Sequence, residues 1–153
     1  MGFLDGLFGK KSDSKDAAAP TAQPKPQSAL VHRDSIPFSL KTSFRPVRLK
    51  ARSENSCELL LGIRNISDSD HMCSIVVEIP KSLGFDGMGI HKTKELRLGS
   101  FAAGASKDLS VTVSANNQTP AGNYRIFVTA YSHYRDYTHV LNSVRKFVEL
   151  RVV

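Results

Sequence analysis

The stretch Pro120–Ala130, PAGNYRIFVTA, does most to decide the fold of this chain. Its proline and glycine favour a tight turn, because proline fixes one backbone angle and glycine accepts angles that other residues avoid. After the turn, apolar and polar side chains alternate, and the apolar positions are Tyr124, Ile126, Val128 and Ala130. A period of two is typical of a β-strand with one buried and one solvated face. The stretch therefore predicts a turn that leads into a half-buried strand.

The same alternation recurs on both sides of this stretch. It is present within residues 47–51, 57–64, 73–79, 96–98, 109–113 and 148–152, with a further strand around Phe38. Segments rich in Gly, Asn, Asp and Ser separate these strands, as expected of turns. Short strands in this number and spacing predict an all-β protein, an immunoglobulin-like antiparallel β-sandwich over residues 35–153. A small barrel is the alternative architecture.

Several turn motifs support the sandwich. Tyr124, soon after a glycine turn and at the start of a late strand, is typical of a tyrosine corner, in which the hydroxyl bonds to nearby backbone. The motifs Leu60–Asn65, Val77–Pro80, Leu98–Phe101 with Gly104, and Pro120–Tyr124 together resemble CARDB and NEW3-type sandwich modules. The resemblance covers residues 45–131, and Ala103 stands where these modules usually have proline. The resemblance implies a fold and not a function, because the shared motifs are sequences that form the turns between strands.

The chain of 153 residues is basic, with a formal net charge of +7. Residues 1–34 hold five basic and four acidic residues, so a charge of +6 belongs to the predicted sandwich. Such a surface attracts nucleic acid, anionic lipid or acidic proteins without distinguishing among them. Solubility alone is the other interpretation of this charge.

The two cysteines and the lack of long apolar runs bear on where the protein acts. Cys57 and Cys73 have no second cysteine or histidine at metal-ligand spacing, so we expect small buried side chains, with a disulfide between them as the alternative. No run of 18 apolar residues is present, and the N-terminus lacks the pattern of a secretory signal. These features predict a cytoplasmic protein.

Residues 1–11, MGFLDGLFGKK, predict an amphipathic N-terminal tip. Four apolar side chains recur at helical spacing, followed by two lysines: Phe3, Leu4, Leu7, Phe8, Lys10 and Lys11. A helix this short is marginal in water, so the tip needs a surface on which to fold. The candidates are the inner face of an anionic membrane and a groove in a protein, and the further alternative is that the segment has no role. The tip resembles the membrane-targeting segments of SepF-type cell-division anchors. Residues 12–34, rich in Pro, Ala and Ser, predict a flexible linker.

The segment between the last two predicted strands is the strongest candidate for a binding site. Three of the four tyrosines lie within Tyr131–His139, together with two histidines and an arginine. Tyrosine and arginine are frequent anchors at protein interfaces, and loops at the end of a sandwich often carry recognition. The predicted partner-binding residues are Tyr131, His133, Tyr134, Arg135, Tyr137 and His139. Packing of these side chains on a hairpin is the alternative.

No motif for a catalytic nucleophile, a phosphate-binding loop or a metal site is present, so the sequence predicts no catalytic residue, metal or cofactor. We therefore expect a non-enzymatic adaptor that binds a protein partner and is tethered peripherally to a membrane through its N-terminal tip. The alternative is a soluble module whose basic surface binds nucleic acid or an acidic protein. Nucleic acid is the less favoured partner, because no RNA-binding motif is present. The oligomeric state is left open.

Overall fold

The computed structural model describes residues 37–153, which form eight β-strands and no helix. The strands are β1 (Phe38–Arg45), β2 (Arg48–Leu49), β3 (Asn55–Asn65), β4 (His71–Glu78), β5 (Thr93–Phe101), β6 (Ser106–Ala115), β7 (Gly122–His133) and β8 (Val140–Val152). The predicted tip and linker lie outside the described residues and stay predictions. No helix among residues 37–153 could span a bilayer.

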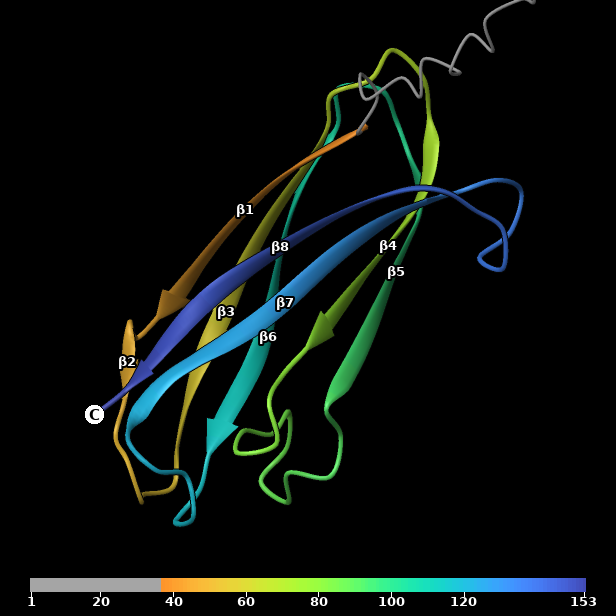
Figure 1. Cartoon of the computed structure of the whole chain (residues 1–153). Helices are drawn as coiled ribbons and strands as arrows, with labels where there is room; N and C mark the ends of the chain where they lie inside the picture. The colour runs from red at the N-terminus through yellow and green to blue at the C-terminus, as the bar shows by residue number, and fades with distance from the viewer. Residues whose placement is uncertain (1–36) are drawn as a thin grey trace, which may run out of the picture. The chain divides into compact units, whose positions relative to one another are not determined.

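The strands form two sheets that pack face to face, as Figure 1 shows. One sheet has three strands in the order β1-β3-β6, and the other has five in the order β2-β8-β7-β4-β5. All neighbours are antiparallel except β2 and β8, which pair in parallel over two residues. This architecture confirms the predicted sandwich.

The core lies between the sheets and is built from the alternate residues that the sequence marks as apolar. From β3 come Leu59, Leu61 and Ile63, and from β7 come Ile126 and Val128, all of them buried. Their polar neighbours along each strand face outward, because successive side chains of a strand point to opposite faces. The same alternation therefore defines two outer faces, one on each sheet.

The turn motifs have the roles that their chemistry suggests. Tyr124 donates its hydroxyl to the Pro120 carbonyl at 2.7 Å, which confirms the tyrosine corner. Asn65, at the end of β3, is fully buried, and its amide nitrogen donates to the carbonyl oxygens of Ser69 and Phe101. The turn after β3 is thus fastened to the end of β5.

Two strands differ from the prediction. β2 is only two residues long, whereas alternation predicts residues 47–51. β8 begins at Val140, eight residues before the predicted start at Val148. The sequence hides this extension because Lys146 stands on the inner side, directly opposite Val128, and is exposed there. A lysine between inward-facing Val144 and Val148 interrupts the apolar alternation by which a strand is recognised.

Both cysteines are free thiols buried in the core, so the alternative of a disulfide between them is not realised. Burial raises the pKa of the Cys57 thiol to about 11 and that of Cys73 to about 12. A thiol with so high a pKa is a poor nucleophile at neutral pH. The two side chains are packing residues.

Candidate functional site

The predicted binding residues gather at the end of the β7–β8 hairpin. Tyr131 and His133 lie at the C-terminal end of β7, on the outer face of the five-stranded sheet. Residues 134–139 connect β7 to β8. Figure 1 shows this hairpin reaching beyond the shorter strands at one end of the sheet. The six residues fall into a buried group and an exposed group.

His133 is the centre of the buried group. Its side chain is only 6% exposed, and its Nε2 atom lies 2.6 Å from the Ser74 hydroxyl oxygen. The other ring nitrogen, Nδ1, is buried with no hydrogen-bond partner within residues 37–153. Burial lowers the pKa of His133, and Arg97 lowers it further, whereas Glu95 and Asp136 act in the opposite direction. The neutral imidazole is therefore the favoured form.

Tyr137 covers His133 and fastens the loop to the neighbouring strands. Its ring meets the imidazole edge to face at a centroid distance of 5.1 Å. Its hydroxyl oxygen accepts a hydrogen bond from the Gly99 backbone N–H at 2.9 Å. The Arg97 guanidinium lies 4.7 Å from the centre of the same ring. Tyr137 thus joins the loop to β5, two strands away from β7.

Asp136 fixes the conformation of the loop itself. Its carboxylate accepts hydrogen bonds from the Thr138 hydroxyl at 2.6 Å and the Thr138 N–H at 2.9 Å, and lies 2.7 Å from His139 Nδ1. The bonds from Thr138 and His139 lower the pKa of Asp136 to about 2. The Tyr134 N–H closes the base of the loop by donating to the His139 carbonyl at 2.9 Å.

Tyr134 and Arg135 form the exposed tip of this fixed loop. Tyr134 is 50% exposed, and the Arg135 guanidinium lies 5.0 Å from the centre of its ring. Arg135 has a backbone φ of 68°, in the left-handed region that favours glycine. The strained position thus carries a side chain that stacks on an exposed tyrosine. Such outliers are often found at binding sites.

Sequence reasoning missed the residues that support the site from other strands. Ser74 and Arg97 belong to β4 and β5 and lie side by side in the sheet, and Tyr131 faces Ser74 from β7. No local motif marks Ser74 or Arg97 as a neighbour of the predicted segment. Only the strand pairing brings them together, which a single sequence does not reveal.

A second group of aromatic and arginine side chains continues along the same outer face. Phe127 and Phe147 lie directly opposite each other on β7 and β8, with ring centroids 6.4 Å apart. The Arg145 guanidinium covers Phe127 at 4.2 Å, and that of Arg125 covers Phe147 at 5.1 Å. Each guanidinium also meets a carboxylate, Arg125 with Glu149 at 3.3 Å and Arg145 with Glu78 at 3.0 Å. The arginines therefore have partners within the sheet.

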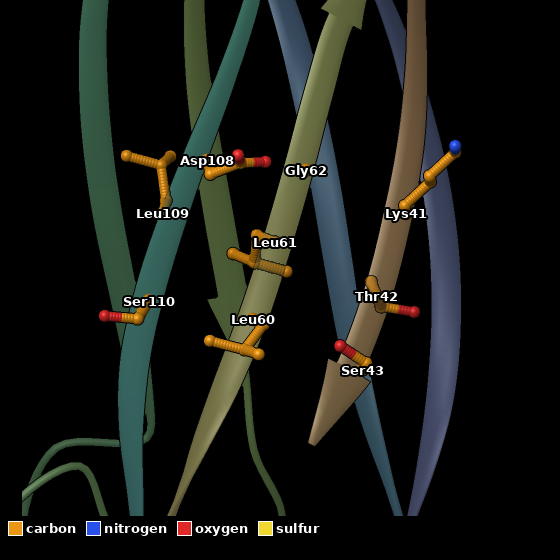
Figure 2. Close-up of a pocket in the computed structure, with 9 residues that line it drawn as sticks. All are labelled: Lys41, Thr42, Ser43, Leu60, Leu61, Gly62, Asp108, Leu109 and Ser110. Atoms are coloured by element: carbon orange, nitrogen blue, oxygen red, sulfur yellow. The ribbon is translucent and has the colours of Figure 1, made fainter. Parts of the chain in front are cut away.

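The outer face of the three-stranded sheet bears a shallow hollow, shown in Figure 2. Gly62 of β3 forms its floor, with Lys41 of β1 on one side and Asp108 of β6 on the other. A methyl group added to Gly62 would lie 3.3 Å from the Asp108 carboxylate oxygen, so the missing side chain makes the hollow. No buried polar group points into it from the residues that line it, and we assign it no ligand.

The described residues do not form a catalytic triad at this site. Ser74 and His133 form a hydroxyl–imidazole pair, but the second ring nitrogen meets no carboxylate, which a catalytic triad requires. Ser74 is also buried beneath the loop. Among residues 37–153, no group of His, Cys, Asp and Glu is placed to hold a metal ion.

Comparison with known proteins defines the class by fold alone. No family model matches the sequence, and no curated protein matches it. Part of Escherichia coli alpha-2-macroglobulin, from domain MG7 to the C-terminus, is similar in structure, with a TM-score of 0.54 at 16% identity over 75% of this chain. The chain spans only 16% of that structure.

Two smaller domains are also similar over most of their length. A CARDB domain from Pyrococcus furiosus has a TM-score of 0.43 at 16% identity, covering 76% of this chain and 85% of its own. The seventh PapD-like domain of human CEP192 has a TM-score of 0.43 at 13% identity, covering 78% and 87%. The two packed sheets of residues 37–153, together with the likeness to the alpha-2-macroglobulin structure, define an immunoglobulin-like β-sandwich domain.

Proposed function

We propose that this protein is a non-enzymatic adaptor that binds a protein partner through the tip of its β7–β8 loop. The observation that carries the proposal is the combination of a fixed loop with an exposed anchor. Asp136 and Tyr137 hold the loop in one conformation, and Tyr134 and Arg135 project from it. A preordered loop loses little entropy on binding, and tyrosine and arginine supply much of the energy at protein interfaces.

Binding of nucleic acid to the basic outer face is less well supported. Nucleic-acid surfaces need open aromatic rings for stacking and free cations for phosphates. Here Arg125 and Arg145 cover Phe147 and Phe127, and each arginine already meets a carboxylate. The rings and the charges of this face are therefore used within the sheet.

A photoreactive amino acid in place of Tyr134, in the full chain in its native cells, tests the loop directly. We expect one discrete crosslinked product from this position and none from Ser110, an exposed residue on the opposite face. Arg135→Gly should reduce the yield without lowering the melting temperature, because glycine accepts the left-handed backbone. Equal crosslinking from Tyr134 and Ser110, or none from Tyr134, would rule out the loop as the binding surface.

The membrane tether is a separate part of the proposal and rests on the sequence of residues 1–11. Co-sedimentation with anionic and neutral vesicles, for the full chain and for a chain lacking residues 1–11, tests it. We expect the full chain to pellet with vesicles, more strongly with anionic ones, and the chain lacking residues 1–11 to stay in solution. Pelleting of both chains on anionic vesicles would instead assign binding to the basic sandwich, and pelleting of neither would remove the tether.

A further inference from the structure

Four arginines in the described part of the chain lie over aromatic rings, with the guanidinium carbon between 4.2 and 5.1 Å from the ring centre. The pairs are Arg97 with Tyr137, Arg125 with Phe147, Arg135 with Tyr134, and Arg145 with Phe127. All of them belong to the five-stranded sheet or to its β7–β8 loop. These arginines share one kind of contact and differ in what meets the edge of the guanidinium.

Three of these arginines also meet a carboxylate. The ion pairs are Arg97 with Glu95 at 3.2 Å, Arg125 with Glu149 at 3.3 Å, and Arg145 with Glu78 at 3.0 Å. A guanidinium is planar, so its face can cover a ring while the N–H groups at its edge bond to a carboxylate. The sheet thus repeats one arrangement of ring, arginine and carboxylate.

Arg135 lacks the third member of this arrangement. Its side chain is exposed, and within residues 37–153 its guanidinium contacts the Tyr134 ring but has no hydrogen bond and no ion pair. The adjacent acid, Asp136, directs its carboxylate to Thr138 and His139 instead. The edge of the Arg135 guanidinium is therefore available to a group from outside these residues.

Apolar side chains lie near this guanidinium at the end of the hairpin. Tyr134, Val140 and Leu141 are 50%, 52% and 59% exposed. The Tyr134 N–H bonds to the His139 carbonyl, so Val140 follows directly where the loop closes. A partner that covers these side chains also removes water from around Arg135, and an ion pair is stronger where water is excluded.

We propose that the partner of the β7–β8 loop presents an Asp or Glu side chain to Arg135, next to an apolar residue that packs on Val140 and Leu141. This inference rests on the proposed function of the loop and names the chemistry of the partner, a short acidic and apolar peptide segment. The carboxylate completes at Arg135 the arrangement that the other three arginines already have. Paired hydrogen bonds between guanidinium and carboxylate are among the strong ones in proteins.

The charges of the loop favour a carboxylate over a phosphate. Phosphate groups on peptides are usually bound by clusters of arginines, whereas residues 134–139 hold a single arginine. Hydrogen bonds from Thr138 and His139 hold the pKa of Asp136 at about 2, so the residue next to Arg135 is negatively charged at neutral pH. A phosphate carries close to two negative charges and is repelled more strongly by this acid than a carboxylate is.

Selection of peptides from a random displayed library on the full chain tests this chemistry. We expect the enriched peptides to share an Asp or Glu next to an apolar residue, and to bind the Arg135→Gln chain about tenfold more weakly or worse. Arg64→Gln removes an exposed arginine from the outer face of the three-stranded sheet, and this matched control should leave binding unchanged. Equal melting temperatures show that both variants are folded. No enrichment, enriched peptides without a shared acid, or equal binding to Arg135→Gln overturns the proposal.

Synthetic versions of an enriched peptide distinguish a carboxylate from a phosphate. Replacing its acid by the matching amide, Asn or Gln, should weaken binding by about tenfold or more, because the amide has the same shape but no charge. Arg135→Lys should recover only part of the affinity lost in Arg135→Gln, because lysine keeps the charge but not the planar fork. A version with phosphoserine in place of the acid that binds more tightly would assign the loop to phosphorylated partners and refute the proposal.

Photocrosslinking in the native cells separates a failure of this inference from a failure of the proposed function. The photoreactive amino acid replaces Leu141, so that Tyr134 and Arg135 stay in place. We expect a discrete product with a second protein, reduced about tenfold by Arg135→Gln and unchanged by Arg64→Gln. An equal yield from Arg135→Gln would refute the carboxylate contact and leave the loop as the binding surface. No product from any chain, or a crosslink within the chain itself, would refute both.

Discussion

The outer faces of the two sheets differ sharply, although the same alternation of side chains produces both. On the face of the three-stranded sheet, Gly62 lies between the charged side chains of Lys41 and Asp108, and its hollow is open to solvent. The face of the five-stranded sheet is covered at one end by a loop that buries His133 beneath Tyr137. Alternation determines which residues face outward, whereas the connection between strands determines whether an outward residue becomes buried. Substitutions on the two faces should therefore have very different effects.

The largest effect is expected at His133. Truncation by His133→Ala leaves a cavity under Tyr137 and leaves the buried Ser74 hydroxyl without its partner. We expect a loss of roughly 2–3 kcal/mol in the free energy of unfolding, measured by chemical denaturation. Ser110→Ala on the other face is the control and should be close to neutral. If both variants lost a similar amount of unfolding free energy, the two outer faces would not differ in burial as described.

Tyr137→Phe isolates the hydrogen bond that fastens the loop. The ring and its contact with Arg97 remain, while the Gly99 N–H loses its acceptor. We expect a loss of about 1 kcal/mol, together with faster hydrogen exchange at the Gly99 amide. Exchange at Gly99 that is unchanged in the variant would show that the loop is held in another way.

Acid should weaken the covered end of the five-stranded face. Because folding lowers the pKa of His133 below 6.5, the unfolded chain takes up a proton first as the pH falls. The free energy of unfolding then falls with pH, from 6.5 down to the folded pKa. The variant His133→Gln lacks this titration, so its stability difference from the native chain should shrink in acid. A stability difference between the native chain and His133→Gln that stays the same at every pH would contradict the lowered pKa of His133. Folding also lowers the pKa of Asp136, from 3.8 to about 2, so its contribution to the free energy of unfolding is lost at lower pH, between these two values.

Gly62→Ala is expected to have the smallest effect. The added methyl group approaches the end of the exposed Asp108 side chain, which is free to turn away. Alanine also restricts the unfolded chain, so we expect a gain of up to about 0.5–1 kcal/mol in thermal denaturation. A clear loss of stability would mean that the hollow is more tightly packed than its open geometry indicates.

The sequence predicts the inner faces of this protein better than its site. Ile126 and Val128 are recognisable as core residues because their alternation is local, and the Pro120–Tyr124 turn is recognisable because its chemistry is local. The segment Tyr131–His139 is identifiable by composition alone. Its division into a buried and an exposed group is not, because that division depends on where Ser74 and Gly99 lie.

By itself, the sequence determines the strands, the turns between them and the side of each strand that meets the core, since these follow from a period of two and from the backbone preferences of a few residues. Only the tertiary structure decides that β8 continues back to Val140 and that Tyr137 reaches the backbone of β5. Each of these depends on contacts between residues far apart in the chain. Such contacts leave no periodic trace in the sequence, because the partner strand and not the neighbouring residue sets the environment.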